Sequence, residues 1–208
     1  MQYTNKNRIA GLSVLVDFEK AFDTIEWDFL FKSLASYNIG IDFLSWVRLL
    51  YSNITSCTLN NGYLSNNFNL SRGIRGIFQG CPISALLFIL VAEILSTKPR
   101  SCANAKGITI NKIEFKICQL ADDTTIFAHD VKSLQVFIRE FTLFEEVSGL
   151  KVNLDKSEIT PLGPLRLGEL AMQKDLNMLK VNKNEFKTLG IWLSRDLQRS
   201  ENLNLDKN

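Results

Sequence analysis

The residues best suited to chemistry in this sequence are two adjacent acids, Asp122 and Asp123. They lie within Gln119–Phe127 between two apolar, β-branched runs, a pattern that predicts a tight hairpin with acids at its tip. Because side chains alternate faces along a strand, the turn must re-aim one carboxylate before both can point the same way. Carboxylate oxygens suit a hard cation such as Mg²⁺, which keeps waters for a phosphate-bearing substrate. The alternative is a solvated Asp-Asp turn, since Asp is a common turn residue.

A third acid, Asp17, follows a short β-rich run, Gly11 to Val16, which predicts a buried strand with a carboxylate at its end. The order strand-acid, helix, helix, strand-Asp-Asp-strand, helix, strand is compatible with a split βαβ unit. In that unit the first strand lies beside the hairpin, which would bring Asp17 next to Asp122. Two carboxylates from adjacent strands can bridge a pair of Mg²⁺ ions for an in-line phosphoryl displacement. Such a site transfers nucleotides or cleaves phosphodiesters.

Helices and hairpins are expected around these acids. Asp23 and Glu26 have the spacing of a capping box, which opens a helix that Gly40 stops. A second helix from about Asp42 carries an apolar stripe that we expect in the core: Phe43, Trp46, Val47 and Leu50. Asn61-Gly62 within Thr55–Leu70 predicts an exposed hairpin.

The second half of the chain continues with alternating helix and strand patterns. The glycine-rich segment 71–82 lets backbone approach a ligand closely. The remaining expected elements are a helix at 84–95, a loop at 96–105, a hairpin around Asn111-Lys112, a helix at 132–148 capped by Gly149, a strand at 150–154, a loop with a possible short helix at 160–184, and a strand at 186–193.

Composition indicates one globular domain spanning 1–208, with a core at about 11–193 and a polar, frayed tail at 194–208. The chain has 208 residues, of which 46% are apolar, including fourteen Phe, enough for one sizeable core. Twenty-four basic and twenty-two acidic residues give a net charge of +2, so any basic surface for nucleic acid must be local.

Cysteine usage and the polar start favour an intracellular location, in the cytoplasm or the nucleus. The four cysteines form no CxxC pair and His129 is the single histidine, so no zinc spacing is present. We therefore expect reduced thiols. The start lacks the apolar core of a signal peptide, and the longest apolar run, Ile83–Val91, is too short to span a bilayer and predicts a buried helix. No membrane partner and no protein partner are inferred.

Five ordered segments resemble the palm motifs of reverse transcriptases from LINE-type (non-LTR) retrotransposons. They are Val16–Asp23, Gln79–Ser84, Leu120–Asp123, Gly149–Asn153 with Lys156-Ser157, and Leu189–Ile191. The resemblance runs from about Gly11 to Leu193. It implies an α+β palm and an RNA-directed DNA polymerase that uses an RNA template, a DNA primer, dNTPs and two Mg²⁺ ions, with Mn²⁺ as a possible substitute.

Carried over by motif, Asp17 and Asp122 resemble the two metal-bridging acids of this family. Asp123 corresponds to the third carboxylate, at the primer end. The backbone carbonyl of Phe18 corresponds to a further metal ligand. The resemblance thus implies Asp17, Asp122 and Asp123 as the catalytic residues.

The resemblance also implies nucleotide-binding residues. Phe22 stands where the family places a bulky side chain beneath the sugar, where a 2′-hydroxyl would clash with the ring. Gln79 and Gly80 match the turn that contacts nucleotide and template. Lys156 aligns with a basic residue proposed to protonate the departing pyrophosphate; the alternative is an ordinary solvated lysine.

The sequence departs from the family pattern in two ways. Gly76-Ile77-Phe78 separates Arg75 from the Gln-Gly pair, which lengthens the nucleotide-contact loop. The chain is also expected to be a palm fragment with fingers and thumb largely missing, which would bind nucleic acid weakly. These departures leave two alternatives open: a decayed, catalytically inactive retrotransposon remnant, and a palm-like nuclease or cyclase that uses the same acids.

Overall fold

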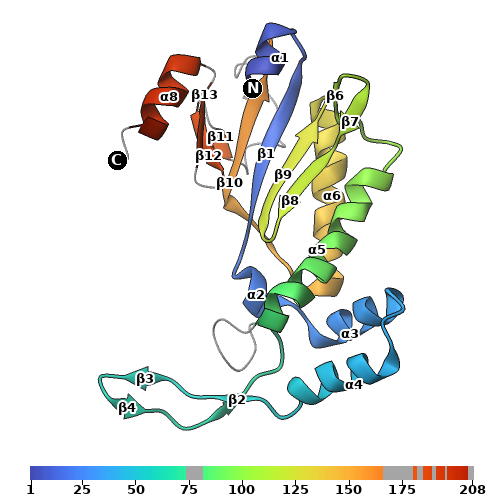
Figure 1. Ribbon diagram of the computed structural model, residues 1–208, viewed down its shortest axis with the longest axis vertical. Coiled ribbons are helices and arrows are strands. Elements are labelled where there is room, and N and C mark those ends of the chain that lie inside the picture. The colour runs from blue at the N-terminus through green and yellow to red at the C-terminus, as the bar shows by residue number, and fades with distance from the viewer. Residues whose placement is uncertain (74–81, 166–179, 182–184, 189–190, 195, 206–208) are drawn as a thin grey trace. The chain divides into compact units, whose positions relative to one another are not determined.

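The computed structural model (Figure 1) describes the chain apart from residues 74–81, 166–179, 182–184, 189–190, 195 and 206–208. The chain forms two compact units, each assembled from stretches that are separate in sequence. The first unit comprises Met1–Phe18, Ser96–Thr142 and Val152–Asn208, and the second comprises Glu19–Leu95 and Leu143–Lys151. The assignment of 1–208 to a single domain stays a prediction.

The first unit is built on a five-stranded sheet with the order β11-β10-β1-β9-β8. Its strands are β1 (Gly11–Phe18), β8 (Ile117–Leu120), β9 (Asp123–Ala128), β10 (Val152–Leu162) and β11 (Lys180–Val181). The unit also contains α1 (Gln2–Lys6), β6 (Ile108–Ile110), β7 (Ile113–Phe115), β12 (Glu185–Thr188), β13 (Ile191–Ser194) and α8 (Leu197–Leu205).

The strand order confirms the predicted split βαβ unit. β1 pairs antiparallel with both β9 and β10, so these two strands run parallel to each other with β1 between them. Helix α6 (Val131–Ser148) connects β9 to β10. The first strand therefore lies beside the Asp-Asp hairpin, as expected, and the α+β palm class is confirmed.

In the first unit, helix α6 packs on the sheet through Phe141. It begins after Asp130, whose Oδ1 accepts the backbone N–H of Ser133 at 2.7 Å, a side-chain N-cap. Within the first unit the ring of Phe141 stacks on Phe18 of β1, with 6.3 Å between centroids. The helix ends before Gly149, whose φ of +75° confirms the predicted glycine cap.

The second unit contains three short helices and two small strand pairs. They are α2 (Ala21–Thr24), α3 (Trp27–Ser36), α4 (Ile41–Leu50), β2 (Thr55–Ser56), β3 (Leu59–Asn60), β4 (Tyr63–Leu64) and β5 (Phe68–Asn69), with the part of α5 (Pro82–Ser101) up to Leu95.

The predicted capping box at Asp23 and Glu26 is wrong. Glu26 is itself the N-cap residue of α3, without a side-chain cap, and Asp23 belongs to the separate short helix α2. The backbone N–H of Glu26 donates to the Ser148 carbonyl at 2.9 Å, and its carboxylate lies 3.8 Å from Arg72. Helix α3 ends at Ser36, well before the predicted stop, because the chain turns through Tyr37 and Asn38.

The predicted core stripe of α4 is also largely wrong. Trp46 is 66% exposed, and Phe43 and Leu50 are exposed as well, whereas Leu44 and Val47 are buried. Apolar residues surround most of this helix, so periodicity alone does not define the buried face.

Both hairpins predicted from turn residues are present. Asn61 and Gly62 join β3 to β4, and Asn111 and Lys112 join β6 to β7. All four residues have positive φ, the pattern of a type I′ turn. Asn-Gly is the preferred sequence for this turn, whereas Lys112 occupies a position that usually favours glycine.

Helix α5 is longer than expected, because its helical backbone continues through Pro99 into the predicted 96–105 loop. Of the described residues, those of α5 alone are long and apolar enough to cross a membrane by length and composition. In its most apolar window 44% of the residues are buried, and the core helix of a soluble protein passes the same test. Neither finding assigns the helix to a membrane.

Two predictions near the C-terminus are wrong. The strand expected at 150–154 extends to Leu162, which pairs with Gly11. The polar tail forms helix α8 in its described part, where the side chain of Asn204 bonds the backbone N–H and carbonyl of Trp192. These bonds satisfy backbone groups that a frayed tail would leave to water.

Candidate active site

The β8–β9 hairpin has a two-residue loop, Ala121-Asp122, closed by the pair Leu120 and Asp123. Ala121 has a φ of +53°, whereas Asp122 does not have positive φ, as in a type II′ turn. Glycine is the usual residue at this first position, so Ala121 holds a backbone conformation that costs energy. The predicted tight hairpin is confirmed, with one difference: Asp123 is the first residue of β9 rather than part of the turn.

Asp17 reaches this hairpin from the neighbouring strand β1. Val16 pairs with Thr124, so the next residue, Asp17, lies beside Asp123. Asp122 follows in the adjoining turn, and its expected proximity to Asp17 stays a prediction. Because Phe18 packs toward α6, strand alternation places the Asp17 side chain on the opposite face of the sheet.

The environment of Asp123 differs from that of a free carboxylate. Partial desolvation, followed by the negative charges of Asp122 and Asp17, raises the pKa of the Asp123 carboxyl above its ordinary value. Asp17 is half-buried, and Asp122 and Asp123 are exposed. The arrangement therefore concentrates negative charge at one solvent-accessible edge of the sheet.

On the other side of Asp17, β10 departs from regular pairing. Leu15 pairs with Glu158, and Asp17 pairs with Asn153. The two pairs are therefore two residues apart on β1 but five residues apart on β10. The extra residues form a bulge, and the backbone N–H of Lys156 donates to Asn153 Oδ1 at 3.2 Å. Lys156 is thus presented by an irregular segment beside Asp17, and its side chain is exposed.

Ser157 closes this bulge. Its Oγ accepts the backbone N–H of Asp17 at 3.1 Å and donates to the carbonyl of Asn153 at 2.7 Å. Ser157 is fully buried. Sequence analysis assigned no role to Ser157 or Asn153, although both lie in the motif that contains Lys156.

Phe18 and Phe22 fall in different units. Phe18 ends β1, next to Asp17, and its ring packs on Phe141; the role of its carbonyl stays a prediction. Phe22 belongs to α2 in the second unit, where its ring stacks on Phe88 of α5 at 4.4 Å between centroids and 25° between planes. Gln79, Gly80 and the 76–78 insertion lie outside the described residues.

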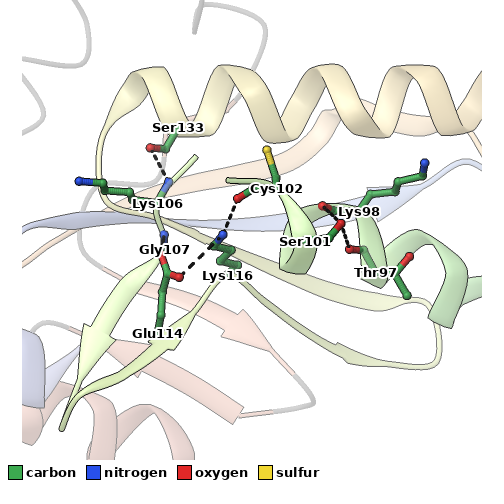
Figure 2. A network of polar contacts seen from close by, with 9 residues as sticks. All are labelled: Thr97, Lys98, Ser101, Cys102, Lys106, Gly107, Glu114, Lys116 and Ser133. Atoms are coloured by element: carbon green, nitrogen blue, oxygen red, sulfur yellow. Dashed lines mark hydrogen bonds and ion pairs between the residues drawn. The ribbon is translucent and has the colours of Figure 1, made fainter. Parts of the chain in front are cut away.

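A largely buried lysine holds the chain just before β8 (Figure 2). Lys116 Nζ donates to the carbonyl of Cys102 at 2.6 Å and lies 3.7 Å from Oε2 of Glu114. Glu114 Oε1 accepts the backbone N–H of Gly107 at 2.7 Å. These contacts tie the end of α5 to the segment from which the Asp-Asp hairpin starts.

The donor set fits Mg²⁺. Within the described part of the chain, no group of three or more His, Cys, Asp and Glu side chains is placed to hold a metal ion by itself. Mg²⁺ commonly uses one or two carboxylates and completes its shell with water and substrate phosphates, so a full protein cage is not required. Desolvation and then the charges of Asp122 and Asp17 raise the pKa of Asp123, and a bound cation would relieve the repulsion between these carboxylates.

The sequence of this chain matches a known protein family and two known proteins. The family described as reverse transcriptase (RNA-dependent DNA polymerase) matches residues 2–193. The chain is 30% identical over 142 residues to the retrovirus-related Pol polyprotein from type-2 retrotransposable element R2DM of Drosophila melanogaster, covering 68% of this chain and 13% of that protein. It is 26% identical over 198 residues to the transposon TX1 uncharacterized 149 kDa protein of Xenopus laevis, covering 91% of this chain and 14% of that protein.

Two solved structures share the fold. Apo telomerase from Candida tropicalis, truncated from its C-terminal domain, superposes with a TM-score of 0.62 at 12% identity, covering 92% of this chain and 37% of that one. Telomerase from the same organism in complex with the TWJ fragment of telomeric RNA gives a TM-score of 0.60 at 12% identity, covering 92% of this chain and 31% of that one.

Proposed function

Because this chain belongs to the reverse transcriptase (RNA-dependent DNA polymerase) family, we propose that Asp17, Asp122 and Asp123 form the nucleotidyl-transfer site of an RNA-directed DNA polymerase. The two relatives are a Pol polyprotein of a retrotransposable element and a transposon protein, in agreement with the motifs of non-LTR reverse transcriptases. The chain spans 13% and 14% of the length of these relatives. The activity, substrates and partners given below are therefore proposals for this 208-residue chain.

The observation that carries this proposal is the position of Asp17 beside Asp123 on neighbouring strands, with Asp122 in the adjoining turn. Three carboxylates from two strands converge on one exposed edge. A solvated Asp-Asp turn would not need an acid from β1 at the same place.

Asp17, Asp122 and Asp123, with the Phe18 carbonyl, would hold two Mg²⁺ ions, for which Mn²⁺ could substitute. When bound, the ions activate the primer 3′-hydroxyl and neutralise charge on the leaving pyrophosphate. The carboxylates fix the reacting groups in position, which supplies much of the rate in phosphoryl transfer. Lys156, on the bulge beside Asp17, would hold the proton that the pyrophosphate receives.

We assign the selection of dNTP over rNTP to Phe22, and the binding of template and primer to a basic surface. The stack on Phe88 fixes the Phe22 ring, which would exclude a 2′-hydroxyl and so favour dNTPs. Family membership supports binding of a nucleic-acid template, here proposed as RNA with a DNA primer. With a net charge of +2, phosphate contacts must come from local basic groups.

Primer extension on an RNA template with Mg²⁺ tests the proposal. We expect extension by the chain and its loss in Asp122→Ala. Asp130→Asn is the control, since it removes a charge from the same unit but keeps an N-cap side chain. Equal extension by the chain and Asp122→Ala would refute the assigned site.

The alternative is a catalytically inactive remnant, favoured by the Gly76-Ile77-Phe78 insertion next to the Gln-Gly pair. A variant that lacks these three residues belongs in the same assay. If it extends primers and the natural chain does not, the insertion accounts for inactivity. If neither extends, the chain is not an enzyme by itself.

A further inference from the structure

The backbone N–H of Asp17 bonds to a side chain at the point where the register between β1 and β10 shifts. Up to Leu15, β1 follows a continuous register with β10, and the register resumes only at Asp17 and Asn153. At this second pair the N–H of Asp17 donates to Ser157 Oγ at 3.1 Å. The hydroxyl thus takes the place of a backbone acceptor at the residue that carries the carboxylate.

Ser157 is suited to a fixed position. It is fully buried, and its own proton is committed to the Asn153 carbonyl at 2.7 Å. With the hydroxyl proton oriented there, a lone pair is available for the Asp17 N–H. One side chain therefore joins both ends of the bulge to the strand that bears Asp17.

We propose that Ser157 is a positioning residue. By fixing the backbone of Asp17, it sets the position of the Asp17 carboxylate in the site. This inference rests on the proposed function of Asp17 as a metal-binding acid. Asp17 lies one residue beyond the Val16–Thr124 pair, level with the first residue of β9, and the Ser157 bond restrains it from the side of β10. In phosphoryl transfer a misplacement of about 1 Å can cost on the order of a hundredfold in rate.

The same bulge carries Lys156. The Asn153 side chain accepts the N–H of Lys156 at 3.2 Å while the Asn153 carbonyl accepts the Ser157 hydroxyl. Ser157 therefore couples the segment that presents Lys156 to the backbone of Asp17. Loss of the hydroxyl should disturb catalysis through position, with little effect on dNTP affinity.

The first test measures amide hydrogen exchange at Asp17 by NMR in the full chain, which requires no activity. Ser157→Ala removes the acceptor, and we expect Asp17 to exchange at least tenfold faster, whereas Ser157→Thr keeps the hydroxyl and the protection. Ser133→Ala is the matched control, because Ser133 is also buried and its Oγ accepts the N–H of Lys106 at 3.0 Å. Unchanged exchange at Asp17 in Ser157→Ala would overturn the inference.

The second test uses primer extension and Mn²⁺ titration followed by paramagnetic broadening. In Ser157→Ala we expect kcat to fall about tenfold or more at nearly constant KM for dNTP, with weaker Mn²⁺ binding, and recovery in Ser157→Thr. Equal effects of Ser157→Ala and Ser133→Ala on kcat and Mn²⁺ binding would show a merely structural role. If no form extends primers, the proposed function fails, while Asp17 exchange and Mn²⁺ binding still decide the role of Ser157.

Discussion

Asp17 lies beside Asp123 across the β1–β9 pair, one residue beyond Val16 and Thr124. The pair joins an acid from the central strand of the sheet to the first residue of the strand after the turn. Because of this pairing, carboxylates from separate parts of the chain lie together at one end of the sheet. It is to these carboxylates that we assign the proposed nucleotidyl transfer.

Phe22→Ala should relax sugar discrimination. Removing a ring that is stacked on Phe88 opens space for a 2′-hydroxyl, so we expect the preference for dNTP over rNTP to fall at least about tenfold, near the low end of single-contact discrimination. Single-nucleotide incorporation of both substrates measures this ratio. Phe29→Ala is the control, because Phe29 is also half-buried and packs edge-on against Phe144 at 5.2 Å in the same unit. Continued exclusion of rNTP by Phe22→Ala would favour a palm-like nuclease or cyclase.

Lys116→Met should lower the free energy of unfolding by about 1–3 kcal/mol, since the part-buried carbonyl of Cys102 would lose a charged donor. Urea unfolding followed by circular dichroism measures the change. Lys106→Met should stay within about 0.5 kcal/mol, because its side chain is exposed. Equal stability of Lys116→Met and Lys106→Met would show that the contacts in Figure 2 contribute nothing net.

Asp130 should make stability depend on pH. Burial raises the pKa of the Asp130 carboxyl, but hydrogen bonds from Ser133 and His129 outweigh burial and hold the pKa below its ordinary value. A lowered pKa in the folded state stabilises the protein above the unfolded value of about 3.9, and this contribution is lost as pH falls from there through the folded pKa.

Urea unfolding at several pH values tests this linkage. Asp130→Ala should lose about 1 kcal/mol at pH 7, as for other N-caps, whereas Asp130→Asn should keep most of the cap and show a weaker fall in stability below pH 4. An identical acid profile in the natural chain and Asp130→Asn would contradict the assigned cause.

Much of this architecture was accessible from sequence because local signals and global fold agree. Asn61-Gly62 indicated its hairpin, Gly149 indicated the end of α6, and the order of the elements indicated the split βαβ unit. The exposed face of α4 was not accessible, because apolar residues occur around most of that helix and periodicity cannot choose among them.

The site itself was only partly accessible. The acids were evident from their types and motifs, but the register that brings Asp17 level with Asp123 emerged from the structure. The Ser157 contact joins residues 140 positions apart and arises from a bulge, which has no simple sequence pattern. Lys156 was recognised by motif alone, and its place on that bulge emerged from the structure.

The most direct measurement is single-nucleotide extension of a DNA primer on an RNA template, with Mg²⁺, by the natural chain, Asp17→Asn and Asp123→Asn. A metal-ion contribution of several kcal/mol predicts that each variant loses at least about a hundredfold in rate, while Asp130→Asn retains the natural rate. Extension by Asp17→Asn at the natural rate, or no template-dependent extension by the natural chain, would contradict the account.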